Sequence, residues 1–347
     1  MGFNSSQLAE TVQRNCHIAD AKHGADYTLC IYLMKMREYY RWEQGLGFTD
    51  RIPKDDVGDW LVEREGLWNE LDEKSFESLS VNGREIDPFD ADKINGQLLQ
   101  DQMVYGGGLG HSGRPHFFLA ELLRHEQVED YSLLVSGREL ARDLTAPPAM
   151  SLNKTIYIRR ESLKRMLWER LENWRWSSPD NAMGRALANY DFDNQLDESL
   201  EQMTNAETEA VLWHEIGEVK AGTLLGEQWQ EMLDDLLFTP AEIMARAVRD
   251  HLADCLETLP NLLMQNRTSS IHFYIGSLSH MRKEVFPSLK KAYEDWRQSE
   301  DISRLYQLAE LGRAHWLELG QEMLDIHKSE GDASATSIAE FIKSRYL

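Results

Sequence analysis

The sequence has few cysteines, and their spacing does not predict a disulfide framework or a zinc site. Cys16, Cys30 and Cys255 are the only cysteines in 347 residues, and none belongs to a CxxC pair. Structural zinc sites and small disulfide-rich domains need closely spaced cysteine pairs, so the spacing excludes both. We expect buried free thiols in a reducing compartment.

Long apolar runs and a basic leader are also missing. No uninterrupted apolar run reaches the ~20 residues that cross a bilayer as a helix. The N-terminus has no basic region followed by an apolar core, which is the pattern of a signal peptide. We therefore expect neither a membrane-spanning helix nor a signal peptide, and we expect a cytoplasmic protein.

Basic residues are scarce beside acidic ones. The chain has 37 Lys and Arg against 59 Asp and Glu, a formal net charge of -22. Affinity for nucleic acid comes largely from neutralising phosphates, and an anionic membrane surface repels an acidic chain in the same way. The charge predicts neither nucleic acid nor a membrane as partner. It would attract a cationic ligand or a basic protein.

Apolar and aromatic residues are plentiful enough for a large core. Hydrophobic residues make up 42% of the chain, with ten Trp and twelve Tyr, which excludes a disordered acidic protein. At ~150 residues per domain the length predicts two domains. We expect an N-terminal helical domain over residues 1–200, with a small α+β insert, and a C-terminal helical bundle over residues 201–347.

Helical spacing of apolar residues dominates the chain, so we predict a mainly α fold, a multi-helix bundle. The exception is the insert near residues 104–158, where we predict two to three short strands. Segments 116–124 and 131–135 are expected to pair as antiparallel strands, and 155–158 to add a third. A short helix is expected over 138–144.

Residues 16–43 give the clearest hint of a site. The middle of this stretch, 27–36, is almost wholly apolar or aromatic, which is typical of a buried helix. We expect a break near Gly24, because the whole helix would be unusually long. Polar side chains on a buried face need partners, so this face predicts one wall of a site. It comprises Cys16, Asp20, His23, Tyr27, Cys30 and Met34.

Histidines with a carboxylate one helical turn later recur in the second half: His214/Glu218, His251/Asp254, His280/Glu284 and His315/Glu318, with Glu322 one turn further. Helical bundles build di-iron and di-manganese sites from inward-facing His and Glu, although in the reverse order along the helix. The alternative is a set of core histidines with solvated acids. We predict a site for iron, manganese or zinc. Its expected ligands are His23, His214, Glu218, His251, His315 and Glu322.

Haem is a weaker alternative cofactor. The stretch LAETVQRNCHIADA, residues 8–21, resembles the first helix of haem-oxygenase-like proteins, in which a histidine is followed by alanine and an acid. The corresponding residues here are His17, Ala19 and Asp20. The resemblance covers only this stretch, and it assigns no residue a role.

A glycine-dense stretch, YGGGLGHSGRP at 105–115, predicts a flexible loop. Gly108 to Gly113 match GxGxxG, but Arg114-Pro115 follow in place of a helix, so a nucleotide would lack the helix amides that hold its phosphates. We expect His111, Arg114 and His116 to contact an anionic ligand.

The sequence favours a cytoplasmic metal-binding helical protein with oxidoreductase-type chemistry, and it leaves open whether the chain is an enzyme. The alternative is a non-enzymatic acidic adaptor or assembly factor that docks a protein partner or forms a homo-oligomer. Chelation would lower the stability of the metalloprotein and leave the adaptor unchanged.

Overall fold

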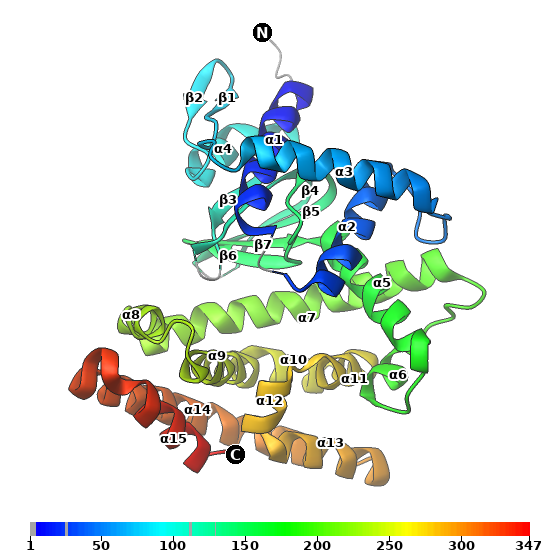
Figure 1. Ribbon diagram of the computed structural model, residues 1–347. Coiled ribbons are helices and arrows are strands. Elements are labelled where there is room, and N and C mark those ends of the chain that lie inside the picture. Colours follow the sequence, from blue (N-terminus) through cyan, green and yellow to red (C-terminus); the bar gives the residue numbers. More distant parts are fainter. Residues whose placement is uncertain (1–4, 25–26, 111–112, 129) are drawn as a thin grey trace. The chain divides into compact units, whose positions relative to one another are not determined.

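The computed structural model describes residues 5–24, 27–110, 113–128 and 130–347 (Figure 1). The chain forms two compact units, Met1–Trp168 and Glu169–Leu347. Residue 200, where the sequence placed the domain boundary, lies inside helix α7 (Leu196–Leu225). Helix α5 (Arg160–Ser177) begins in the first unit and ends in the second.

The first unit begins with three helices and then turns to strands. Its helices are α1 (Ser5–His23), α2 (Leu29–Glu43), α3 (Lys54–Leu71), α4 (Ala91–Leu98) and the 3-10 turn η2 (Leu99–Asp101). Asn82-Gly83 connect a small antiparallel hairpin of β1 (Leu79–Val81) and β2 (Arg84–Ile86). The expected break near Gly24 is confirmed, since α1 ends at His23 and α2 starts at Leu29.

A five-stranded sheet forms the centre of the first unit, in the order β3-β4-β5-β7-β6. Strands β5 and β7 run parallel, and the other neighbours run antiparallel. The strands are β3 (Met103–Leu109), β4 (Pro115–Val128), β5 (Tyr131–Arg142), β6 (Ala149–Leu152) and β7 (Thr155–Arg159). The prediction of a mainly α fold is confirmed, but the β-containing part is larger than the two to three short strands that the sequence predicted.

Two local predictions in this region were wrong. The glycine-dense stretch is not a loop over its first half, which forms β3. A Cβ on Gly106 would lie 2.1 Å from the Phe118 ring, and one on Gly107 would lie 2.2 Å from the carbonyl oxygen of Pro88. The glycines therefore allow close packing. Most of the segment expected as a helix over 138–144 is instead the end of β5, where pairing with β4 outweighs local helix propensity.

Helix α1 packs against β4 and β5 and shares their core. Leu8, Val12 and Cys16 lie in one buried cluster with Phe117 and Leu119 of the sheet. The Cys16 thiol donates to the carbonyl oxygen of Phe117 at 3.2 Å. This contact holds the last turns of α1 against the end of the sheet at which the candidate site lies.

The second unit is helical throughout, as predicted for the C-terminal bundle. Beyond α5 and α7 its elements are α6 (Ala182–Leu187), α8 (Gln228–Asp235), α9 (Pro240–Ala253), the π-turn η4 (Asp254–Thr258), α10 (Leu259–Met264), α11 (Thr268–Ser277), α12 (His280–Val285), α13 (Pro287–Ser299), α14 (Ser303–Glu330), the 3-10 turn η5 (Gly331–Ser334) and α15 (Ala335–Ser344). Its core contains the fully buried Trp316.

The sequence Thr239-Pro240-Ala241-Glu242 has the pattern of a helix start, and Thr239 does cap α9: its hydroxyl accepts from the Glu242 amide. The sequence Thr204-Asn205-Ala206-Glu207 has the pattern of a capping box and predicts a helix start that is wrong, because α7 already begins at Leu196 and the Thr204 hydroxyl donates to the Leu200 carbonyl.

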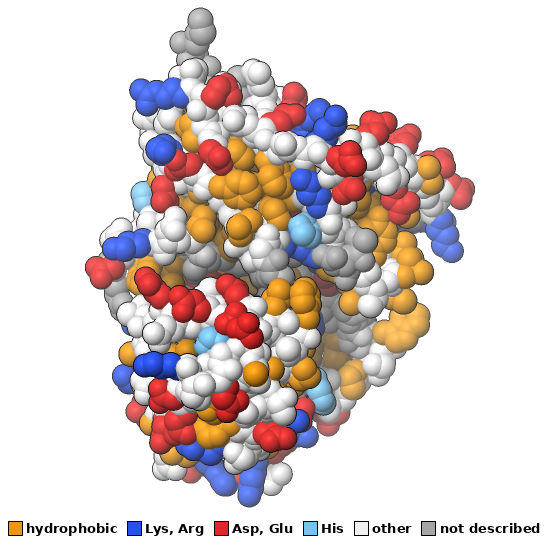
Figure 2. Space-filling view, turned by 60° about the vertical axis from the view of Figure 1, so that its left-hand side comes forward, with side chains coloured by type: hydrophobic (Ala, Val, Ile, Leu, Met, Phe, Trp, Pro, Cys, Tyr) orange, Lys and Arg blue, Asp and Glu red, His pale blue; other side chains and the backbone are white. Residues whose placement is uncertain are grey.

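The surface carries both acidic and basic side chains, as the amino-acid composition predicts. Figure 2 shows acidic side chains scattered among basic ones on one face, with hydrophobic side chains gathered in patches. Cys16 and Cys255 are buried free thiols as expected, whereas Cys30 is exposed. Within the described part of the chain, no helix has the length and apolar character needed to cross a membrane.

Helices α7 and α9 approach closely because α7 has a glycine at the contact. A Cβ on Gly217 would lie 2.3 Å from the backbone oxygen of Ala253, whereas one on Gly222, further along α7, would meet nothing within 4 Å. Overpacking a core contact costs about 1–3 kcal/mol. Replacing glycine by alanine in an open helical position stabilises by up to ~1 kcal/mol.

We therefore expect Gly217→Ala to lower the free energy of unfolding by about 2 kcal/mol and Gly222→Ala to raise it slightly. Chemical denaturation of the two variants checks this. A Gly217→Ala variant as stable as the wild type would contradict the close approach of the two helices.

Candidate functional site

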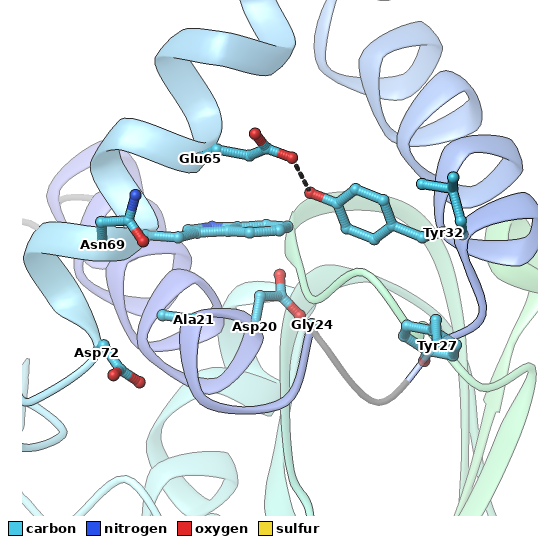
Figure 3. Close-up of a pocket in the computed structure, with 10 residues that line it drawn as sticks. Asp20, Ala21, Gly24, Tyr27, Tyr32, Glu65, Asn69 and Asp72 are labelled. Carbon is cyan, nitrogen blue, oxygen red and sulfur yellow. Dashed lines mark hydrogen bonds between the residues drawn. The ribbon is translucent and has the colours of Figure 1, made fainter.

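A cavity of about 460 Å³ lies in the first unit beside α1, α2 and α3. Figure 3 shows Asp20 and Ala21 on α1, with Gly24 just after it. Glu65 and Asn69 lie on α3 and Asp72 just after it, and Tyr27 and Tyr32 lie on the side of α2. Leu29 and Trp68 complete the lining. The break between α1 and α2 therefore positions the cavity, because it exposes the last turn of α1.

The lining is acidic and aromatic. Asp20, Glu65 and Asp72 supply three carboxyl groups, and the described residues that line the cavity include no lysine or arginine. The Tyr32 hydroxyl donates to Glu65 Oε1 at 3.0 Å, which orients both side chains at the cavity wall (Figure 3). Burial raises the pKa of Tyr32, and the hydrogen bond to the Glu65 carboxylate raises it further, so this hydroxyl keeps its proton.

Asp20 is the one carboxyl group of the cavity that is nearly fully buried. Both of its oxygens lie 3.0 Å from the backbone nitrogen of Leu144, which donates to them. Burial raises the pKa of Asp20 well above its usual range, and the neighbouring Asp143 carboxylate raises it further. The Leu144 amide opposes this shift only in part. Asp20 thus binds a proton more strongly than an ordinary aspartate.

Asp143 lies behind Asp20 and has the opposite character. His116 Nδ1 donates to Asp143 Oδ2 at 3.2 Å, and the Phe117 amide donates to the same oxygen at 3.2 Å. Burial alone would raise the pKa of Asp143, but the His116 hydrogen bond and the charge of Arg159 hold it below its usual range. Two neighbouring carboxyl groups with pKa values shifted apart are the pattern of acid–base sites.

A small enclosed cavity connects these residues. It is lined by Asp20 and Asp143 and by Tyr27, Arg114 and Thr145, among others. The Tyr27 hydroxyl lies 2.7 Å from Thr145 Oγ1, and Arg114 Nη1 donates to it at 2.9 Å. These contacts hold the segment after β5 against the start of α2.

Next to Asp20 on α1, His17 is held neutral. Arg64 Nη1 donates to His17 Nε2 at 2.6 Å, and burial together with the Arg64 charge lowers the pKa of His17 to about 3. Arg64 in turn donates to both oxygens of Glu43. Arg64 is therefore already paired, and it is not among the residues that line the cavity.

Two family models match the chain. One, a family of unknown function (DUF6866) N-terminal domain, matches residues 7–159, and the corresponding C-terminal domain matches residues 164–345. The chain belongs to the DUF6866 family. No curated protein and no solved structure matches it. The cavity and the Asp20–Asp143 pair lie within the DUF6866 N-terminal domain.

The structure brings together some of the residues that the sequence singled out in this DUF6866 domain. Of the predicted face, Asp20, His23 and Tyr27 line the two cavities. Cys16 lies in the core, whereas Cys30 and Met34 are exposed.

Of the three residues predicted to contact an anion, His111 lies outside the described residues. Arg114 donates to the hydroxyl groups of Tyr27 and Thr145. His116 forms a hydrogen bond with Asp143. That predicted ligand stays a prediction.

The six predicted metal ligands are divided between the two domains. His23 is in the N-terminal domain, and the others are in the C-terminal domain. His214 Nδ1 lies 2.8 Å from Asp254 Oδ1, and its Nε2 lies 3.8 Å from Glu218 Oε1. His251 is buried against Trp316 and donates from Nε2 to the Arg282 carbonyl. Among the described residues no group of three or more His, Cys, Asp and Glu side chains could hold a metal ion.

Glu322 accepts from Arg345 at 3.3 Å. His315 packs edge-on against the Trp316 ring, and burial is the main cause of its lowered pKa. In the described part of the domain, neither side chain forms a possible metal site of three or more ligands with His214 or His251.

Sequence reasoning missed Glu65, Trp68 and Asp143. Asp143 fell in the segment predicted as a helix, so its place beside Asp20 was hidden. Glu65 is one of several acidic residues on α3, and the sequence does not distinguish it from the others. The only available signal was Asp20 itself, a carboxyl group on an otherwise buried helical face.

The two aspartates should affect stability with opposite signs. A carboxyl group with a raised folded-state pKa stabilises the fold only while it is protonated, so stability falls as pH rises above about 4. Asp20→Asn should therefore raise the melting temperature at neutral pH, with a gain that vanishes toward pH ~4. Asp143, whose folded-state pKa is lowered, contributes stability above that pH.

Asp143→Asn should accordingly lower the neutral-pH melting temperature, with a loss that shrinks on acidification. Thermal unfolding of both variants across pH measures the pair. Equal effects of the same sign would contradict opposite shifts in the two carboxyl groups.

Proposed function

We propose that the N-terminal domain binds a small organic cation, an amine or guanidinium compound, in the cavity above Asp20. The observation that carries the proposal is the lining: three carboxyl groups and aromatic rings surround about 460 Å³, and the described lining residues include no lysine or arginine. Pockets with a few convergent polar groups and residues of shifted pKa are the default binding sites of a fold.

Asp20 is the group that would contact the cation. It is nearly buried, its oxygens face the Leu144 amide, and Asp143 makes its ionisation unfavourable. A cation in the cavity supplies the missing counter-charge and lowers the pKa of Asp20. Binding at neutral pH should then release a proton from Asp20.

The aromatic part of the lining selects for an organic ion over a hydrated metal ion. The faces of Tyr27 are already occupied, with Lys35 Nζ 5.4 Å and the Arg114 guanidinium carbon 5.1 Å from the ring centre. Tyr32 and Trp68 remain for the ligand, and Glu65 orients the Tyr32 ring. Cations bound over aromatic faces gain about 0.5–2 kcal/mol.

The charge of the whole chain supports the same ligand class. A formal net charge of -22 attracts cations from a distance, and salt screens this attraction. The affinity for an organic cation should therefore fall as ionic strength rises.

The functions predicted from the sequence stay proposals. Oxidoreductase chemistry at a bound iron, manganese or zinc ion is tested by elemental analysis of protein purified without a histidine tag. The adaptor alternative is favoured by α2, whose first turns expose Leu29, Ile31, Leu33 and Met34. Such an apolar surface is typical of a docking site for a protein partner or a second copy. Size measurement of Leu33→Asp protein would test the second-copy case.

Calorimetry with phenylethylammonium tests the cation pocket. We expect the wild-type protein to bind this cation and to bind its neutral counterpart, phenylethanol, much more weakly. Asp20→Asn should weaken binding about tenfold, because a buried charged partner is lost, and should abolish proton release measured in buffers of different ionisation enthalpy. Glu65→Gln should weaken phenylethylammonium binding by only about threefold, because Glu65 is exposed and water screens its charge.

Glu63→Gln is the matched control. Glu63 is exposed on α3, two residues from Glu65, and does not line the cavity, yet the variant removes the same charge. It should leave the affinity unchanged. The proposal is wrong if the two probes bind alike, or if Glu63→Gln and Glu65→Gln weaken binding equally.

A further inference from the structure

The C-terminal domain has a cavity of its own, of about 570 Å³, beside α6, α11, α12 and α13. Its walls carry both charges and apolar groups. The charged lining residues are Asp180, Arg185, His280, Lys283, Glu284, Lys290 and Glu294.

Each carboxylate of this cavity already has a cationic or hydrogen-bonding partner. Asp180 Oδ1 lies 2.7 Å from Arg185 Nη1. Glu294 pairs with Arg297 at 2.6 Å and lies 3.9 Å from Arg185. Glu284 lies 3.6 Å from His280 Nε2 and accepts from the Tyr346 hydroxyl at 3.5 Å. Arginines therefore compensate Asp180 and Glu294, and Glu284 has a histidine and a tyrosine as partners.

Lys283 and Lys290 are different. Among the described residues, no carboxylate forms an ion pair with either ammonium group, although acidic residues outnumber basic ones in the chain. Burial lowers the pKa of Lys283, and the positive charges of Arg170 and Lys290 lower it further. The two lysines repel each other at one cavity, and neither has an ion-pair partner in the described part of the domain.

The rest of the cavity is apolar and held in place. Phe286 and Tyr293 are almost fully buried, and Ile275 and Leu278 lie beside them. The Tyr293 hydroxyl lies 2.9 Å from His272 Nδ1 and accepts from Arg185 Nε at 3.3 Å. These contacts hold the ring, so the cavity presents a preformed apolar surface next to the two lysines.

We propose that this cavity binds a small organic anion, whose carboxylate or phosphate group contacts Lys283 and Lys290 and whose apolar body packs against Phe286 and Tyr293. The proposal does not depend on the cation pocket. It concerns a different domain, a ligand of opposite charge and a separate set of residues.

An anion between the lysines removes their mutual repulsion, and the apolar body gains by leaving water. The two effects act together only for a ligand that has both parts. Inorganic phosphate alone should therefore bind more weakly than a phosphate carried on an aromatic ring.

Calorimetry with phenyl phosphate tests the proposal on the full chain. We expect binding of phenyl phosphate and weaker binding of inorganic phosphate. Lys283→Gln and Lys290→Gln should each weaken phenyl phosphate binding about three- to fivefold, as expected for exposed charges. Lys291→Gln, on the neighbouring exposed residue of α13 outside the cavity, is the matched control and should change nothing.

A second measurement does not depend on variants folding. Lys283 has a lowered pKa, so it should react with acetic anhydride faster than Lys291 at about pH 8, because more of its amine is neutral. Phenyl phosphate should protect Lys283, as read by mass spectrometry. Absence of phenyl phosphate binding to the wild type, or equal losses in Lys290→Gln and Lys291→Gln, would overturn the proposal.

Discussion

The hydrogen bonds from the Leu144 amide to both oxygens of Asp20 tie the last turn of α1 to the chain that leaves β5. The candidate site depends on this link. It holds Asp20 beside Asp143, and the helix ends there, so the side chain of Asp20 faces a cavity. A buried carboxyl group next to a buried carboxylate costs free energy, and it persists because α1 is held to the sheet by apolar packing around Val12 and Phe117.

The charged groups at the two cavities differ in burial and in pairing. In the N-terminal domain, charges are packed deep in the fold and paired, as in the fully buried Arg159 with Glu139 at 2.8 Å. Burial and the neighbouring Asp143 oppose the ionisation of Asp20, which lines a cavity. In the C-terminal domain, Lys283 and Lys290 have no ion-pair partner among the described residues, and both line a cavity. A ligand of the opposite charge could therefore compensate each of these groups.

Local patterns in the sequence predicted part of this arrangement. The break near Gly24, the cap at Thr239 and the helical character of the second half follow from propensity and spacing, which act over a few residues. The strands were harder to predict from the sequence. Residues 138–142 pair with β4 in the sheet although their apolar spacing also suits a helix, and the glycines of β3 fit against Phe118, which is distant in sequence. The histidine–carboxylate pairs were real neighbours on their helices, but helix spacing cannot say which helices face one another.

The sequence by itself determined a mainly helical, acidic chain with a polar face on its first helix, because composition and periodicity are local properties. It pointed to Asp20 and Tyr27 as members of one site. Only the tertiary structure decided that Asp143, Glu65 and Tyr32 meet them there, and that Lys283 and Lys290 face a common cavity. These groups come from separate strands and helices, so their distances are set by how the elements pack, which no spacing along the chain records.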